Sequence, residues 1–286
     1  MDKNTKKIAI LLAVYNGEKY LTTQIESIIS QTNQDWILYI RNDASSDNTS
    51  QLINAYCKKY DNIIEIDKGG SNLGCYKNFF RLLEVVDAEY YMFCDADDYW
   101  LPEKIEISYN FIKRKELLYP LMPLLVHTDK AIADENLNVV FSSHWKYSRF
   151  NPDSISKFEH VPLRIVGGAT AMFNAFCKPL ALEPNSFHDA HDGWLAFQTS
   201  RFGKIFAIHQ PLLIYRRHGQ NVTDKDSSKV NFRKKVSKLK NFKSFFLNHL
   251  KIAAQLQQFG YGGVIKYFYY RIVVFFKIIF AKITVR

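Results

Sequence analysis

Three carboxylates lie within four positions of one another in segment 94–98, which reads Cys-Asp-Ala-Asp-Asp. Like charges this close repel, and each raises the pKa of the others unless a cation neutralises them. Oxygen ligands suit Mg²⁺ and Mn²⁺, and Mg²⁺ is commonly held by one or two carboxylates together with substrate phosphates. The segment therefore predicts a divalent-metal site. The alternative is a polar turn that caps the helix beginning near Leu101-Pro102, and the position of the acids after an apolar strand favours the metal.

Four apolar runs in the first hundred residues would position these acids. They begin at residues 8, 36, 62 and 90 and are separated by helical patterns. A Thr23-x-x-Glu26 capping box predicts the start of the first helix, Asp47 can cap the second, and the third covers about 76–86. Strands and helices that alternate at this spacing predict βαβ units, an α/β fold and a mostly parallel sheet flanked by helices. Ligands of such sheets bind beyond the carboxyl ends of the strands.

Later elements are expected as a helix to about residue 115, a strand at 124–127, a helix at 190–201 and one or two strands at 205–215. Residues 134–165 have no regular pattern.

Polar residues also follow the other three strands. Each of them could be ordinary turn chemistry. Together they predict a nucleotide-binding edge, because parallel strands end at the same edge of a sheet. A uracil or thymine imide can donate a hydrogen bond to a carboxylate such as Asp43. The nucleotide-binding candidates at this edge are Tyr15, Asn16, Glu18, Asp43, Asn72, Gly74 and Asp95.

The four motifs in this order resemble those of the family 2 glycosyltransferases. They are Val-Tyr-Asn-Gly-Glu-Lys-Tyr-Leu at 14–21, Asn-Asp-Ala-Ser-Ser-Asp-Asn-Thr at 42–49, Asn-Leu-Gly at 72–74 and Asp-Ala-Asp-Asp at 95–98. The resemblance covers roughly residues 7–224 and implies a GT-A fold, a Rossmann-like nucleotide-binding sandwich. Segments 191–194 (His-Asp-Gly-Trp) and 215–221 (Tyr-Arg-Arg-His-Gly-Gln-Asn) are similar to those of a bacterial subgroup that includes rhamnosyltransferases of surface polysaccharide assembly. Gly193 stands where that subgroup commonly has Trp.

The resemblance implies a role for each matching position. Asp43 would contact the nucleotide base, Asp95 the ribose or the metal, and Asp97 the metal. Asp192 would be the general base that takes the proton from the acceptor hydroxyl, in a direct displacement with inversion. The Mg²⁺ or Mn²⁺ ion would neutralise the departing diphosphate. Candidates for contact with the diphosphate or the acceptor are Arg216, Asn221, Gly168, His191 and Trp194.

Three of these positions also have an ordinary structural interpretation. Asp192 could simply cap the helix that follows it. Gly167-Gly168 could form a plain turn instead of letting the backbone approach a sugar. His218 is a candidate metal or diphosphate ligand, and although a lone histidine is more often structural, the two arginines beside it favour phosphate.

The charge is distributed unevenly along the chain. Residues 229–286 contain 13 Lys or Arg and no Asp or Glu, although the whole chain has 28 acidic residues. We therefore divide the chain into a GT-A domain at 1–226 and a basic amphipathic helical tail at 227–286. No apolar run in the tail reaches the roughly 18 residues of a spanning helix, because Lys266, Arg271, Lys277 and Lys282 interrupt it. The tail is expected to lie on a membrane surface, the alternative being a helix packed on the protein itself or on a second subunit. Its helical spacing begins with Phe232, Val236, Leu239, Phe242, Phe246 and Leu250.

The expected partners are a nucleotide-diphosphate sugar donor, a lipid-linked saccharide acceptor and an anionic membrane surface, with a homodimer left open and no nucleic acid. The absence of a recognisable signal peptide and of paired cysteines predicts a cytoplasmic enzyme, peripheral on the inner face of the plasma membrane. A nucleic-acid-binding protein is a competing interpretation, although the tail is too apolar for a groove-binding element. Metal-dependent nucleotidyl transfer is another, although the Walker lysine loop is missing.

Overall fold

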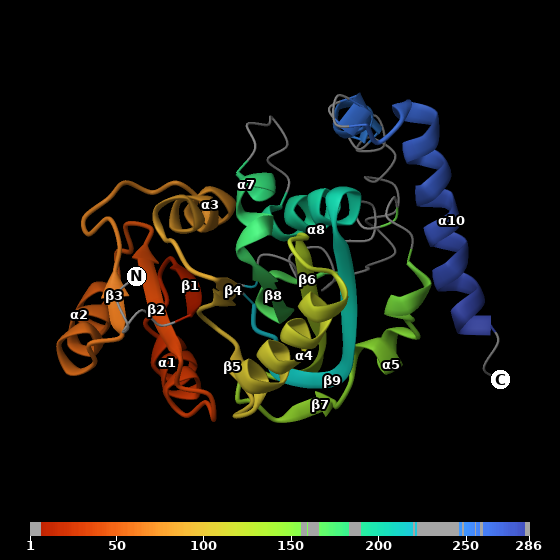
Figure 1. The fold of residues 1–286 in the computed structure, drawn as a ribbon. Helices are drawn as coiled ribbons and strands as arrows, with labels where there is room; N and C mark the ends of the chain where they lie inside the picture. The colour runs from red at the N-terminus through yellow and green to blue at the C-terminus, as the bar shows by residue number, and fades with distance from the viewer. Residues whose placement is uncertain are drawn as a thin grey trace.

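The structure is a computed structural model that describes residues 7–155, 159, 166–182, 190–219, 221, 246–247, 249–254, 256–257 and 260–283, with side chains as far as residue 273. Nine strands form one sheet through the middle of the protein (Figure 1), in the order β3-β2-β1-β4-β8-β6-β9-β5, with β7 paired to β6.

The first four strands of the chain form the parallel half of the sheet. They are β1 (Ile8–Val14), β2 (Trp36–Asn42), β3 (Ile63–Glu65) and β4 (Tyr90–Asp95), and the pairings among these four strands are all parallel. Ala13 pairs with Asp95 and Val14 pairs with Asn42. The three strand ends therefore lie at one edge, as the βαβ pattern predicts.

Beyond β4 the sheet becomes mixed. Its strands are β5 (Tyr99–Trp100), β6 (Leu124–Ala133), β7 (Val139–Phe141), β8 (Ala171–Asn174) and β9 (Lys204–Arg216). The parallel arrangement ends because β8 pairs antiparallel to both β4 and β6. Two antiparallel steps bring β6 back to the direction of β4, and β9 is parallel to β6. The carboxyl ends of β6 and β9 consequently point to the same edge as that of β4.

Helices cover both faces of the sheet. Residues 8, 10, 12 and 14 of β1 face the core beneath α1 (Leu21–Ile29), α2 (Thr49–Lys59) and α4 (Lys104–Leu118). Residues 9 and 11 face α3 (Cys75–Val85), α7 (Lys178–Ala181) and α8 (His191–Phe202). This alternation is the period-two pattern of a strand buried on both sides. The remaining short helices are α5 (His144–Ser148), η1 (Pro152–Ser154), η2 (Gly168–Thr170) and η3 (Ala175–Cys177).

Two local expectations differ from the structure. The capping box at Thr23 is wrong, because α1 begins at Leu21 and no side chain caps it. Glu26 instead accepts a hydrogen bond from Tyr56 Oη at 2.7 Å, which ties α1 to α2. The strand expected at 124–127 continues to Ala133, so it reaches the carboxyl edge of the sheet.

The described part of the C-terminal segment packs against α8. Side chains from both form a buried group that we call the C-terminal cluster: Trp194, Phe197, Ile252, Ala253, Leu256, Tyr261 and Tyr267. A long helix, α10 (Gly263–Ile283), follows and lies on the side of the molecule away from α2 (Figure 1). Phe232, Val236, Leu239 and Phe242 of the expected tail helix lie outside the described residues. Among the described helices, none is both long and apolar enough to cross a membrane.

Candidate active site

Asp43, at the end of β2, is held by three hydrogen bonds. Its buried carboxylate accepts from the backbone N–H groups of Leu73 at 2.7 Å and Gly74 at 2.8 Å, and from Arg41 Nη1 at 2.8 Å. Asn72 Nδ2 donates to the backbone carbonyl of Asp43 at 2.8 Å. A carboxylate has about four acceptor positions, so one remains for a ligand N–H. The sequence candidates Asp43, Asn72 and Gly74 are thus brought together, and Arg41 is a member that the sequence analysis missed.

The loop after β1 is tied to the loop after β2. Asn16 adopts a left-handed conformation, with φ 50°, and its Oδ1 accepts from Ser46 N at 2.9 Å. Glu18 accepts from Asn48 N at 3.1 Å, at the start of α2. Asn16 and Glu18 therefore shape this edge through loop contacts, whereas the ring of Tyr15 is largely exposed.

The charges of four carboxylates reach the thiol of Cys75 at the start of α3. Burial and then the negative charges of Asp95, Asp192, Asp43 and Asp97 raise the pKa of the Cys75 thiol to about 12. These acids come from three separate stretches of sequence, and all of them act on the one thiol. The metal candidates, the base candidate and the nucleotide candidate are therefore all near enough to Cys75 to influence its thiol electrostatically.

The surroundings of Asp95 disfavour its ionised form. Burial, followed by the charges of Asp97 and Asp192, raises the pKa of Asp95 to about 7. Lys130 on β6 partly offsets this rise, and it acts in the same way on Asp98. A cation placed among these acids would lower the cost further.

Asp97 and His218 are in direct contact. Asp97 Oδ2 lies 2.8 Å from His218 Nε2, and the His218 ring packs on Tyr20 with centroids 4.6 Å apart. His218 N donates to Asn221 Oδ1, and Asn221 Nδ2 donates to the carbonyl of Arg216 at 3.0 Å. Asn221 therefore holds the turn that brings His218 to Asp97.

Arg216 brings a buried positive charge to the site. The residue is 5% exposed, and its Nε and Nη1 donate to the backbone carbonyls of Asp97 at 2.8 Å and Glu135 at 2.9 Å. Its guanidinium also lies 4.7 Å from the ring centroid of Tyr20. Nη2 is buried and has no hydrogen-bond partner among the described residues. A phosphate oxygen would satisfy that group by a charge-assisted hydrogen bond.

Asp192 lies in the first turn of α8 and is held by backbone groups. Its Oδ2 accepts from Gly168 N at 3.0 Å, and its Oδ1 accepts from Gly193 N at 2.7 Å. These bonds fix the direction of the carboxylate and leave further acceptor positions on both oxygens.

His191 supports this arrangement from beneath. Its buried ring stacks on Phe79 with centroids 4.1 Å apart and meets Phe93 edge-on at 4.8 Å. Neither ring nitrogen has a hydrogen-bond partner among the described residues, and burial lowers the pKa of the imidazole. A Cβ at position 168 would lie 2.7 Å from His191 Nε2, so this close approach requires glycine.

Two sequence candidates are placed away from the open side of the site. Trp194 is fully buried in the C-terminal cluster, and His191 lies below Gly168. Lys130, by contrast, is on β6 and was not among the sequence candidates. Its Nζ lies 4.1 Å from the ring centroid of Tyr215. We expected this strand to end at His127, which would put Lys130 in a loop. In the structure β6 continues to Ala133 and carries Lys130 toward the edge of the sheet at which the candidate site lies.

The metal candidates fit a site that substrate oxygens would complete. Within the described residues no three acidic, His or Cys side chains converge as a ready cage. Asp97 and His218 touch, however, and Asp95 is electrostatically coupled to Asp97. Mg²⁺ characteristically uses few protein ligands together with phosphates.

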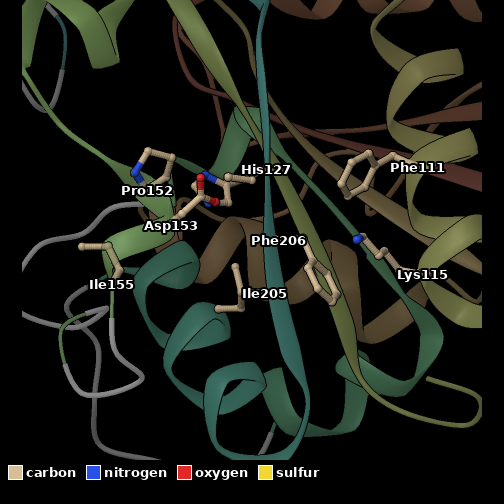
Figure 2. Close-up of a pocket in the computed structure, with 9 residues that line it drawn as sticks. Phe111, Lys115, His127, Pro152, Asp153, Ile155, Ile205 and Phe206 are labelled. Carbon is tan, nitrogen blue, oxygen red and sulfur yellow. The ribbon is translucent and has the colours of Figure 1, made fainter. Parts of the chain in front are cut away.

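A separate pocket of about 260 Å³ lies at the opposite ends of β6 and β9. It is lined by Phe111, Lys115, His127, Pro152, Asp153, Ile155, Ile205, Phe206 and Ala207. Figure 2 shows Phe111 and Phe206 on one side of β9 and Asp153 and Ile205 on the other. None of the candidate site residues lines this pocket, so it is distinct from the acidic cluster.

Comparisons with known proteins agree with this geometry. Residues 9–176 match the family Glycosyl transferase family 2. The chain is 27% identical to dTDP-rhamnosyl transferase RfbG of Shigella flexneri over 240 residues, which cover 80% of this chain and 78% of that protein.

Solved structures share the fold. The S. aureus TarS fragment 1-349 in complex with UDP-GlcNAc has a TM-score of 0.55 at 16% identity and is matched over 78% of this chain and 62% of its own length. The mannosyltransferase PcManGT from Pyrobaculum calidifontis, in complex with GDP-Man and Mn²⁺, has a TM-score of 0.55 at 14% identity, over 75% of this chain and 58% of its own. The chain belongs to glycosyl transferase family 2 and is a glycosyltransferase with a GT-A fold.

Proposed function

We propose that this chain is an inverting glycosyltransferase of surface polysaccharide assembly, of the O-antigen or capsule type. It transfers a sugar, with rhamnose the first to test, from a dTDP- or UDP-linked donor to a lipid-linked saccharide. The name of the Shigella relative supports the dTDP-rhamnose donor. The UDP-GlcNAc bound to the TarS fragment supports a uridine donor.

The observation that carries the proposal is the electrostatic proximity of Asp192 to the acids after β4. Both groups act on the Cys75 thiol at once, and the charge of Asp192 reaches Asp95. We propose that the sugar lies between them, with the base on one side and the diphosphate-binding groups on the other. Direct displacement at an anomeric carbon requires this opposition.

The reaction follows from these positions. A free acceptor position on the Asp192 carboxylate takes the proton of the acceptor hydroxyl. The oxygen forms a bond to the anomeric carbon as the bond from that carbon to the diphosphate oxygen breaks. The electron pair leaves with the nucleoside diphosphate, and the configuration is inverted.

Residues of β6 and β9 stabilise the leaving group. Arg216 Nη2 donates to a phosphate oxygen, and the Lys130 ammonium adds a second positive charge beside Asp95 and Asp98. Asp97 and His218, with Asp95 nearby, would hold a Mg²⁺ or Mn²⁺ ion, which would neutralise the charge of the departing diphosphate as a Lewis acid. The Mn²⁺ ion of the PcManGT complex supports this choice of metal.

The membrane is the proposed location of the acceptor. We assign residues 1–226 to the catalytic domain and 227–286 to a membrane-associating tail on the cytoplasmic face of the plasma membrane. The lack of acidic residues from 229 to 286 supports the tail's attraction to anionic lipid. Packing of the described tail on α8 supports a fixed position relative to the site.

The test is donor turnover by the purified full chain. UDP- and dTDP-sugars are supplied with a lipid-linked acceptor extract, with Mn²⁺, with Mg²⁺ or with EDTA. We expect metal-dependent release of one nucleoside diphosphate together with sugar transfer. Absence of turnover and of donor binding across the whole panel in the presence of metal would overturn the proposal.

A further inference from the structure

The C-terminal segment has two unlike faces. One face of α10 is anchored on the catalytic domain through Tyr267, which is buried in the C-terminal cluster. Its hydroxyl lies 2.9 Å from His249 Nδ1, and Tyr261 of the same cluster packs on Phe197 of α8 with ring centroids 5.7 Å apart. The position of α10 on the body is therefore fixed from one side.

The other face of α10 is apolar and open. Ile265 is 87% exposed, Tyr269 is 58% exposed and Ile272 is 54% exposed. Their spacing of four and three residues places them on one stripe of the helix, which we call the α10 outer face. Phe246 and Leu247 are also exposed, and Phe246 stacks on Phe268 of α10 at 5.3 Å. The open apolar surface thus extends beyond one helix.

Basic side chains flank this stripe on both sides. At 3.6 residues per turn, Lys266 lies about 100° to one side of Ile265 and Arg271 lies about 120° to the other, where Arg271 Nη1 also donates to Tyr267 Oη at 3.4 Å. No acidic residue occurs from 229 to 286. An apolar stripe between basic rims matches the boundary between acyl chains and anionic headgroups. A nucleic-acid backbone would match the rims but would leave the stripe unsatisfied.

We propose that the α10 outer face is a docking surface for an anionic lipid bilayer. Ile265, Tyr269 and Ile272 insert at the headgroup level, and Lys266 and Arg271 contact the lipid phosphates. This proposal rests on the proposed function, which gives a lipid-linked acceptor and a membrane-associating tail, and it names the surface that makes the contact. It adds that the membrane contact is joined to the base-bearing helix, because Trp194 of the C-terminal cluster is two residues from Asp192. The bilayer then orients α8 and its base relative to a lipid-borne acceptor.

The test is co-sedimentation of the full chain with vesicles of phosphatidylcholine alone or of phosphatidylcholine mixed with phosphatidylglycerol. We expect binding that requires the anionic lipid and that weakens at least tenfold in Ile265→Glu. Leu117→Glu is the matched control, because Leu117 is an exposed helical residue, 84% exposed on α4, and the variant has the same charge change. It should retain binding to within twofold.

Further outcomes separate this surface from its alternatives. A Tyr269→Trp variant should be quenched by brominated lipid, which reports insertion and not only charge attraction. An equal loss of vesicle binding in Ile265→Glu and Leu117→Glu would overturn the proposal. So would an Ile265-dependent dimer, or DNA binding by a chain that does not bind vesicles. Donor binding by Ile265→Glu should equal that of the wild type, so failure of the donor assay in both proteins would count against the proposed function and not against this surface.

Discussion

The two halves of the site are built differently. On the donor side, Asp43 is held by hydrogen bonds from a neighbouring loop and from Arg41, and each contributing loop directly follows one parallel strand. On the base side, Asp192 is oriented by backbone N–H groups above a histidine held among aromatic rings. The Asp43 carboxylate on the donor side is thus held by hydrogen bonds at most of its acceptor positions. The base side depends more on close packing. Substitutions on the donor side should change binding, and those on the base side should change turnover.

The largest expected effect is loss of the base. Asp192→Asn keeps the size of the side chain but removes the proton acceptor, so kcat should fall about 10²–10⁴-fold, the usual contribution of general-base catalysis. Donor affinity in the presence of Mn²⁺ should change less than twofold. Initial-rate kinetics and donor titration measure the two quantities. A weakened donor with unchanged kcat would place Asp192 on the donor side instead.

The second-largest expected effect comes from disturbing the packing around Asp192 at Gly168. A Cβ in Gly168→Ala would lie 2.7 Å from His191 Nε2 and 3.5 Å from Asp192 Cβ. We expect kcat to fall about 10²-fold, because small displacements of catalytic groups have effects of this size. Gly167→Ala is the matched control, since its nearest contact would be an ordinary 3.7 Å. Equal kcat values for the two variants would show that close packing does not position the base.

Lys130 should act mainly on the donor. Lys130→Met removes a positive charge beside Asp95 and Asp98, so we expect the donor KM to rise about tenfold, the equivalent of ~1.4 kcal/mol. Lys130→Arg should restore most of the affinity because it restores the charge. The salt dependence of KM should weaken in the methionine variant. An unchanged KM together with a lower kcat would contradict a diphosphate-side role.

The smallest effect concerns stability and not activity. Lys104 is fully buried below Trp100, and burial lowers its pKa from 10.5 to about 7. Between these values the unfolded lysine binds more protons than the folded one, so stability rises with pH there, and the cost of Lys104 is largest below pH 7. Lys104→Met should stabilise the fold by about 1–3 kcal/mol at pH 7, and by less at pH 9.5. Thermal unfolding at both pH values measures this, and destabilisation at pH 7 would refute it.

The difference between the halves also explains what could be predicted from sequence. Asp43, Asn72, Asp95 and Asp97 follow strands of strong apolar pattern, so their common edge follows from parallel pairing alone. The contact between Asp97 and His218, and that between Asp192 and Gly168, join residues far apart in the chain. No periodicity encodes such pairs, because β8 reverses the direction of the sheet between them. The family resemblance identified these residues as candidates, but their contact partners could be identified only from the fold.

Lys130 and Trp194 show two ways in which the sequence misled the assignment of site residues: the first was missed, and the second was wrongly included. Lys130 was missed because the apolar pattern of β6 ends before it, whereas the strand itself continues to Ala133. Trp194 was expected to face substrate because it lies near Asp192 in sequence, but helical geometry turns it into the C-terminal cluster. Proximity in sequence therefore predicted the strand-end loops well and the base helix poorly.

The anomeric configuration of the product tests the central claim most directly. Proton NMR of the glycoside formed by the purified chain from an anomerically pure donor reports whether the configuration at the anomeric carbon changes. We predict inversion, because the proposed mechanism puts the carboxylate of Asp192 on one side of the sugar and the diphosphate-binding groups Arg216 and Asp97 on the other. Retention would require a different arrangement of the reacting groups and would contradict the assignment of Asp192 as the base.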